Sequence, residues 1–171
     1  MCRTLVGRDR NGLGYKKVGR GNVSPVTMNL PKIGIKHGIC LGKRTVADTK
    51  GFFIELNEVL HLAETELVDR FKYICKQNIK SGLFLYENGV IAGSEEAMTN
   101  GIVEAMKHGT NALGFIGLAE TCQAMFGKDH ADGDSKVNKF ADKVIKTIYD
   151  YSKEASERNN LNFSCYFTPS L

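Results

Sequence analysis

The chain has 171 residues, a formal net charge of +4, 42% hydrophobic and 25% charged residues, which is enough for one globular domain with a buried core. Its apolar runs are too short to cross a bilayer and no cleavable leader is recognisable, so we expect a cytoplasmic protein without a membrane partner. The five cysteines lie at long, irregular intervals without a Cys-x-x-Cys pair, which argues against a zinc ribbon and favours free thiols.

Positive charge is concentrated at the start of the chain. Residues 1–50 carry a net charge of +9 and the remainder carries −5. A basic, glycine-rich segment suits an anionic ligand such as nucleotide phosphates or nucleic acid, and it is also compatible with a simple solvated surface. Tyr15 is the one aromatic residue among these early basic residues, so stacking on nucleic acid has little support.

The first 48 residues predict mostly irregular structure. One strand is expected at Val23–Leu30, where apolar and polar residues mix, and Pro31 is expected to end it. Lys36–Lys43 contains two glycines and is predicted to be a loop.

From Thr49 to Asn78 the apolar period changes to 3.6, which predicts a long helix capped by Asp48 or Thr49. The short apolar run Leu83–Tyr86 follows, and Glu87-Asn88-Gly89 forms a turn.

The second half predicts further helices and two strand-like segments. A hydroxyl cap at Ser94 starts a helix to about Lys107, and Asn111–Phe115 is extended. Leu118–Phe126 is a short helix, a third long helix runs from about Asp134 to Asn159, and Asn162–Phe167 alternates like a strand. The expected fold is a helix-rich α/β protein with four short, parallel strands, too few to close a sheet, which indicates a segment of a larger fold.

Five short motifs stand in order along nearly the whole chain. They are Cys2-Arg3-Thr4, Gly19-Arg20-Gly21-Asn22, Thr27-x-Asn29-Leu30-Pro31, Leu113-Gly114-Phe115-Ile116-Gly117-Leu118-Ala119-Glu120 and Ser164-Cys165-Tyr166-Phe167-Thr168-Pro169. Together they resemble the central part of the anaerobic (class III) ribonucleoside-triphosphate reductases, a family of glycyl-radical enzymes. The resemblance implies a fragment of the family's ten-stranded α/β barrel over residues 1–171, with an active-site loop and strand in 1–48 and alternating helices and short strands in 49–171.

The resemblance assigns the thiyl radical that removes the 3′ hydrogen of the ribose to Cys2. It implies that Asn22 hydrogen-bonds the ribose hydroxyls, because an amide both donates and accepts. Arg20 and Gly21 would belong to the same substrate site, with glycine allowing close approach of the backbone. Ser24 is either a supporting polar group or a plain turn hydroxyl.

The closing turn resembles the family's phosphate-binding turn between a strand and a helix. Free backbone N–H groups at such a helix start attract anions, which makes Thr168 and Ser170 candidate phosphate ligands. The family usually continues Thr-Pro-Ala-Glu into a helix, whereas this chain stops at Leu171. Glu120 is a candidate for proton transfer or a polar network, or a plain surface acid.

The resemblance also implies partners and cofactors. The intact enzyme would bind a ribonucleoside triphosphate, and an activase with S-adenosylmethionine and an iron–sulfur cluster would generate its glycyl radical. It would also hold zinc in a C-terminal region, and no cofactor is expected on this chain itself. The glycyl-radical motif, the four-cysteine zinc site and the regulatory nucleotide domain are not recognisable, so the isolated chain is expected to be inactive.

Two further expectations follow from the sequence. A piece of a barrel exposes strand edges and apolar helix faces, which predicts a homo-oligomer. The alternative function is a nucleotide- or nucleic-acid-binding module that uses the basic N-terminal region, with nucleic acid the less expected partner because no known binding motif is present.

Overall fold

A three-stranded parallel sheet runs through the computed structural model, which describes residues 6–168. The strands are β1 (Asn22–Asn29), β2 (Thr110–Ile116) and β3 (Asn162–Phe167), in the order β1-β2-β3. The central strand β2 is buried over six of its seven residues, as is typical of a parallel strand with neighbours on both sides. The helix-rich α/β prediction with parallel strands is confirmed.

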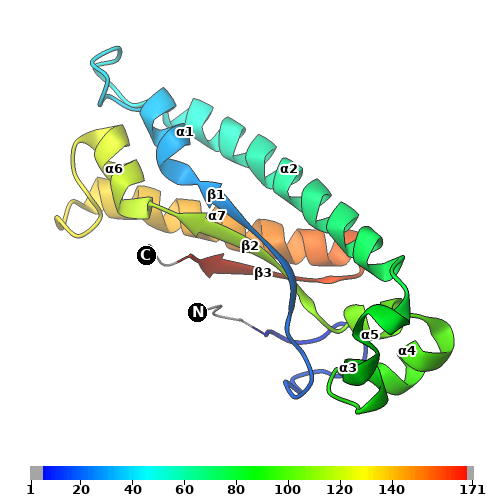
Figure 1. Ribbon diagram of the computed structural model, residues 1–171. Helices are drawn as coiled ribbons and strands as arrows, with labels where there is room; N and C mark the ends of the chain where they lie inside the picture. Colours follow the sequence, from blue (N-terminus) through cyan, green and yellow to red (C-terminus); the bar gives the residue numbers. More distant parts are fainter. Residues whose placement is uncertain (1–5, 169–171) are drawn as a thin grey trace.

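Two long helices cover one face of this sheet (Figure 1). They are α2 (Thr49–Cys75) and α7 (Ser135–Asn159), within three residues of the predicted bounds. Each begins at an aspartate whose side chain accepts hydrogen bonds from backbone N–H groups of the first turn: Asp48 from Gly51, and Asp134 from Lys136 and Val137. These caps fix where the helices begin.

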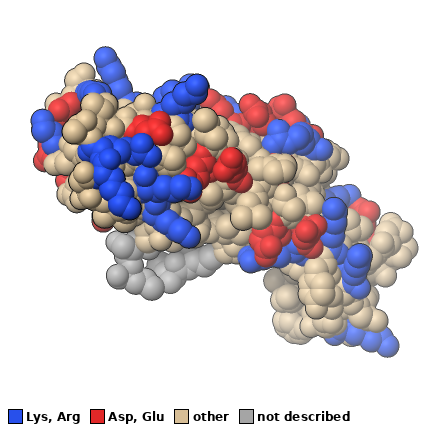
Figure 2. All heavy atoms as spheres, turned by 90° about the horizontal axis from the view of Figure 1, so that it is seen from above, with Lys and Arg blue, Asp and Glu red and all other residues tan. Residues whose placement is uncertain are grey.

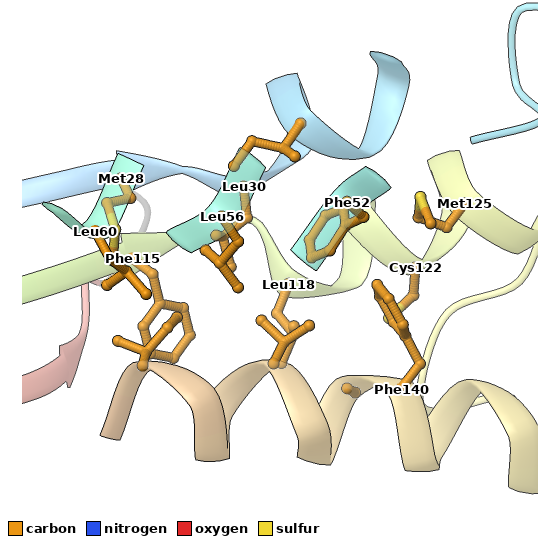
Figure 3. Close-up of a cluster of buried hydrophobic side chains, with 14 of the residues drawn as sticks. Met28, Leu30, Phe52, Leu56, Leu60, Phe115, Leu118, Cys122, Met125 and Phe140 are labelled. Atoms are coloured by element: carbon orange, nitrogen blue, oxygen red, sulfur yellow. The ribbon is translucent and has the colours of Figure 1, made fainter. Parts of the chain in front are cut away.

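The main core lies between the covered face of the sheet and these helices (Figure 3). Phe52 and Leu56 of α2, Phe140 of α7 and Phe115 of β2 belong to this buried cluster. Phe52 and Phe140 meet edge to face, with ring centroids 5.0 Å apart. The 3.6-residue period of each helix therefore corresponds to one buried face.

The opposite face of the sheet carries no helix among residues 6–168, and we call it the open face (Figure 1). Strand alternation places mostly small or polar residues there. Its members are Asn22, Pro25, Thr27 and Asn29 of β1, Thr110, Ala112, Gly114 and Ile116 of β2, and Asn162, Ser164 and Tyr166 of β3.

Helix α1 (Leu30–His37) corrects the prediction of irregular structure and of a loop from Lys36. Pro31 does follow the strand, but it also occupies the first turn of the helix, where a missing N–H costs nothing. Asn29 caps the helix by accepting a hydrogen bond from the Lys32 N–H at 3.2 Å. Helix α6 (Leu118–Phe126), which matches its predicted bounds, packs against α1.

Two further predictions between β1 and β2 are wrong. The described sheet has three strands and not the expected four, and the short apolar run at Leu83 forms helix α3 (Leu83–Glu87) after a 3-10 turn. The helix predicted over residues 94–107 is divided into α4 (Ser94–Asn100) and α5 (Val103–Met106), because Gly101 has a left-handed backbone with φ +98°. Gly93 occupies the cap position of α4, while the Ser94 hydroxyl donates back to the Ile91 carbonyl.

None of the helices within residues 6–168 has the length and apolarity of a membrane span.

Candidate functional site

The predicted site residues fall into two groups at opposite ends of the sheet. Arg20, Gly21 and Asn22 lie at the amino ends of the strands, whereas Glu120 and Thr168 lie at the carboxyl ends. A parallel strand rises by about 3.3 Å per residue, so the two ends are about 20 Å apart. The structure therefore does not bring all the predicted residues into one pocket.

Three other predicted residues belong to neither group. Ser24 is buried on the helix-covered face, where its hydroxyl is 3.4 Å from a guanidinium nitrogen of Arg70. Arg70 also donates to the Pro25 carbonyl at 3.2 Å, so this contact ties β1 to α2. Cys2 and Ser170 lie outside the described residues.

The turn that leads into β1 is fixed by backbone hydrogen bonds on both sides. The Gly19 carbonyl accepts from the Ala92 N–H and the Gly21 carbonyl from the Thr110 N–H, both at 2.9 Å. Gly19 has φ +76°, and a Cβ there would lie 2.7 Å from the Ala92 nitrogen. Only glycine fits at this position, so the position of the following residue, Asn22, is well defined.

Arg20 acts mainly as an internal brace. Its Nε donates to the His108 carbonyl at 2.8 Å, and one terminal nitrogen donates to the carbonyls of Gly7 and Lys16 at 2.9 and 3.0 Å. The other terminal nitrogen is buried and has no partner among the described residues.

A cavity of about 310 Å³ lies beside this turn. The amide oxygen of Asn22 is buried without a hydrogen-bond partner among the described residues, and so is the second terminal nitrogen of Arg20. One residue thus offers an acceptor and the other a donor beside the same cavity, which suits a small hydroxyl-bearing ligand. The cavity is lined by Gly19, Arg20, Gly21, Asn22, Val23, Val90, Ile91, Ala105, Met106 and Gly109.

A buried carboxylate organises the loop before β1. Asp9 accepts hydrogen bonds from the His108 ring at 2.9 Å, from the Leu13 N–H at 2.9 Å and from the Asn162 amide at 2.7 Å. Burial by itself would raise the pKa of Asp9, but these hydrogen bonds outweigh it and hold the pKa below its ordinary value. Sequence analysis missed this cluster, because Asp9 is 99 residues from His108 and 153 from Asn162.

The carboxyl ends of the strands border a larger cavity of about 930 Å³ with mostly apolar walls. Glu120, in the first turn of α6, is exposed at its edge. Burial raises the pKa of the Cys165 thiol in its wall to about 11, so this thiol is protonated at neutral pH. The cavity is lined by Asn29, Pro31, Phe115, Ile116, Gly117, Leu118, Ala119, Glu120, His130, Ile145, Tyr149, Cys165, Tyr166 and Phe167.

Thr168 belongs to a cluster of hydroxyls on the open face near this cavity. Its N–H donates to the Phe115 carbonyl at 2.9 Å, and its hydroxyl is 3.1 Å from that of Thr27. The Tyr166 hydroxyl is 3.4 Å from the same Thr27 oxygen. Gly114 makes room for them, because a Cβ there would lie 2.7 Å from both Thr168 and the Tyr166 ring.

The basic residues of the first fifty positions do not form one surface. Viewed from above, Lys and Arg side chains gather toward the end of the molecule that carries α1, with acidic side chains beside them (Figure 2). Lys32, Lys36, Lys43 and Arg44 line a hollow of about 760 Å³ there, whereas Arg8 lines another hollow with Lys153. This division gives no continuous track for nucleic acid.

No three His, Cys, Asp or Glu side chains come together as metal ligands within the described part of the chain.

Polar groups and cavities at the ends of a parallel sheet with helices on one side are typical of α/β proteins that bind small ligands. The family model for anaerobic ribonucleoside-triphosphate reductase matches residues 1–170. The chain belongs to this family.

Similar proteins agree with this assignment. The chain is 25% identical to the anaerobic ribonucleoside-triphosphate reductase of Haemophilus influenzae and 26% identical to that of Escherichia coli, over 99% of this chain and 23% of each relative. It thus spans about a quarter of the length of these curated relatives. The fold is similar to a crystal structure of the Thermotoga maritima anaerobic ribonucleotide reductase with glycerol in the active site. That comparison has a TM-score of 0.63 and 22% identity, and covers 96% of this chain and 24% of the other.

Proposed function

We propose that this chain is part of the catalytic barrel of an anaerobic ribonucleotide reductase that converts ribonucleoside triphosphates to deoxyribonucleotides by thiyl-radical chemistry. Family membership supports the activity. The observation that carries the site is the buried, unpaired amide oxygen of Asn22 beside the cavity of about 310 Å³. The helix-free open face and the outer edges of β1 and β3 support completion of a ten-stranded barrel by other parts of the enzyme.

In this proposal Cys2, as a thiyl radical, takes the 3′ hydrogen of the ribose. A C–H bond breaks and an S–H bond of similar strength forms. The 2′ hydroxyl then takes up a proton and leaves as water, and a small reductant, formate or a thiol, supplies two electrons while a second proton completes the new C–H bond at C2′. Cys2 finally returns its hydrogen to C3′, which regenerates the thiyl radical. Glycyl-radical generation by an activase, with S-adenosylmethionine and an iron–sulfur cluster, and a zinc site are expected of other parts of the enzyme.

Asn22 orients the sugar. Its amide can accept a hydrogen bond from one ribose hydroxyl and donate to another, and burial strengthens both. The hydrogen bonds at Gly19 and Gly21 fix the backbone before Asn22, so the point from which its side chain starts is defined before substrate binds. Thr168 lies at the carboxyl end of the sheet, whereas Asn22 lies at the amino end. Phosphate binding by Thr168 and Ser170 therefore stays a prediction of the resemblance.

The test uses the complete reductase polypeptide that contains this segment, activated anaerobically, with deoxynucleotide formation as the readout. Cys2→Ser is expected to abolish turnover. Asn22→Ala should lower kcat/KM by about 10²–10³, as is typical when a positioned hydrogen-bonding group is removed. Asn57→Ala is the matched control, because Asn57 is an exposed amide on α2. Retained nucleotide reduction in Cys2→Ser would rule out the proposed chemistry.

Self-association is a second proposal, which rests on the outer edges of β1 and β3. We expect the 171-residue chain to form homo-oligomers that cover them. Light scattering across a concentration series tests this, and a strictly monomeric species at high concentration would contradict it. A nucleic-acid-binding role gains no support, since Arg20 is used internally, and Arg8 and Arg10 line a different hollow from Lys32, Lys36, Lys43 and Arg44.

A further inference from the structure

A groove with four lysines at its rim lies where helices α2 and α7 begin, and we call it the lysine groove. Both helices begin at the same end of the molecule and cover the same face of the sheet (Figure 1). The groove has a volume of about 530 Å³, and none of the described residues that line it is acidic. Its lysines, all exposed, are Lys50 of α2 and Lys136, Lys139 and Lys143 of α7. Positive charge is therefore concentrated around one hollow on the helix-covered side of the sheet.

Lysines elsewhere on the same two helices have carboxylate neighbours. Lys72 of α2 lies 4.0 Å from the Asp69 carboxylate, and Lys146 of α7 lies 2.8 Å from that of Asp150. The four lysines of the groove, in contrast, form no ion pair with a carboxylate among residues 6–168. Their ammonium groups are therefore available to negative charge on another molecule.

The same positions are unfavourable for lysine when only the stability of the fold is considered. Lys136, Lys139 and Lys143 are spaced three and four residues apart on one helix, so their like charges repel one another. Lys50 and Lys136 also lie in the first turns of their helices, next to the positive end of each helix dipole. Fold stability therefore does not account for four lysines here, whereas a negatively charged partner would offset the repulsion.

The floor of the lysine groove is apolar and closely packed. The ring of Phe140 meets those of Phe53 and Phe126 edge to face, with ring centroids 5.7 and 5.0 Å apart. Ile54 also lines the groove and is 52% exposed. An apolar floor between two helices, with charge at its rim, is typical of sites that receive an amphipathic helix.

Two further observations favour a peptide over nucleic acid or a membrane surface. The Lys143 ammonium lies over the Phe53 ring, 4.4 Å from its centroid, and that of Lys136 lies 5.7 Å from the centroid of Phe126. Bases of single-stranded nucleic acid need open aromatic faces for stacking, and these two faces carry cations instead. A bilayer surface is nearly flat and does not fill a hollow between helices.

We propose that the lysine groove is a docking site for an acidic amphipathic helix of a partner protein. Glutamate and aspartate side chains of the partner pair with the lysines, and its apolar side chains contact Ile54 and the edges of the phenylalanine rings. The groove lies on the helix-covered side, opposite the open face, so this inference goes beyond the proposed function and does not depend on the radical chemistry.

The test measures binding of a fluorescein-labelled peptide, with leucines on one helical face and glutamates on the others, by fluorescence anisotropy. We expect it to bind both the complete reductase polypeptide and the 171-residue chain, more weakly as salt is added. Charge reversal in the triple variant Lys136→Glu/Lys139→Glu/Lys143→Glu should weaken binding by about tenfold or more, because attraction becomes repulsion. The matched control reverses the same number of charges at the other end of α2, in Lys72→Glu/Lys76→Glu/Lys80→Glu, and should change the affinity by less than about twofold.

The apolar floor is tested separately with Ile54→Ser. Loss of the exposed isoleucine surface should weaken peptide binding about fivefold. Leu62→Ser is its control, since Leu62 is 69% exposed on the same helix and does not line the groove. Equal affinities of the two serine variants would contradict the apolar contact.

Thermal unfolding gives a readout that does not involve the peptide. Lys136→Glu should unfold at the same temperature as the natural chain or a higher one, because an acidic residue suits the first turn of a helix. A strongly lowered unfolding temperature would show that Lys136 is needed by the fold and would contradict the inference.

Four binding results would also overturn it. They are no peptide binding by the natural protein, unchanged affinity in the triple variant of the groove, an equal loss in the control triple variant, and binding to the 171-residue chain without binding to the complete polypeptide. The last result would show that another part of the reductase covers the groove. Tighter binding of a single-stranded oligonucleotide than of the peptide, lost in the triple variant of the groove, would assign the groove to nucleic acid instead. Because none of these measurements uses deoxynucleotide formation, failure here would leave the proposed function intact.

Discussion

The two ends of the sheet differ in the kind of side chains that surround them. At the amino end, Asp9 accepts hydrogen bonds from Leu13, His108 and Asn162, and the Gly19 turn is fixed by backbone hydrogen bonds. At the carboxyl end, aromatic and aliphatic side chains surround a cavity three times larger, with hydroxyls at its edge. The amino end therefore defines the position of a few atoms, whereas the carboxyl end provides space and apolar surface. This difference suits sugar chemistry at the amino end.

Removing the Asp9 carboxylate is the strongest test of this contrast. Asp9→Ala leaves His108, Asn162 and the Leu13 N–H without their buried partner, and we expect a loss of about 3–5 kcal/mol in the free energy of unfolding. Urea unfolding followed by circular dichroism at pH 7 measures it. Asp142→Ala, an exposed aspartate on α7, is the control. A loss below about 1 kcal/mol would show that the amino end does not depend on this cluster.

Acid should weaken the same end of the molecule first. Because the pKa of folded Asp9 lies below that of the unfolded chain, its charge stabilises the fold above the unfolded pKa, and this contribution is lost as the pH falls through the folded value. We expect the free energy of unfolding to fall below about pH 4. Asp9→Asn should make that dependence shallower without abolishing it, since the pKa values of Glu64 and Asp134 are also lowered. An unchanged pH profile in Asp9→Asn would contradict the assignment.

Alanine substitutions of one glycine at each end of the sheet allow a direct comparison of how tightly the two ends are packed. Gly114→Ala places a Cβ 2.7 Å from both Thr168 and Tyr166, and such overpacking costs about 1–3 kcal/mol. Gly21→Ala meets no atom within 4 Å, so its effect on stability should be small. Thermal unfolding of the two variants measures the difference. Equal losses would mean that the hydroxyl cluster over Gly114 adjusts freely.

The smallest effect is expected at Glu120. The side chain is exposed and makes no hydrogen bond to another residue within 6–168, so Glu120→Gln should change the free energy of unfolding by less than about 0.5 kcal/mol. Chemical denaturation at neutral pH measures this. A larger loss of stability would show that Glu120 makes polar contacts that stabilise the carboxyl end of the sheet.

The long elements could be predicted from the sequence because each carries its own signal. Helices α2 and α7 combine an aspartate cap with an uninterrupted 3.6-residue period, and β3 shows strand alternation before a proline. Helix α1 has only eight residues and contains Gly34, a poor helix former. A Cβ on Gly34 would lie 3.1 Å from Thr121 of α6, so glycine is needed for the two helices to pack closely. Packing between α1 and α6, rather than helix propensity, therefore makes this segment helical.

The candidate site could be predicted only in part. The Gly19–Asn22 motif indicated a tight turn next to a polar amide, and the structure places both beside a cavity. The motif could not show that Arg20 is used as a brace or that Thr168 lies at the far end of the sheet. The contact between Asp9 and His108 escaped notice, because it depends on which distant segments become neighbours in the fold.

The Asp9 cluster also constrains the order of folding. Its members come from the segment before β1, the segment before β2 and the first residue of β3, so the cluster can close only after all three strands are aligned. Contacts of such long sequence separation form late. The loop that precedes Asn22 therefore reaches its final conformation after the rest of the sheet, so an incompletely folded chain would lack the proposed sugar site.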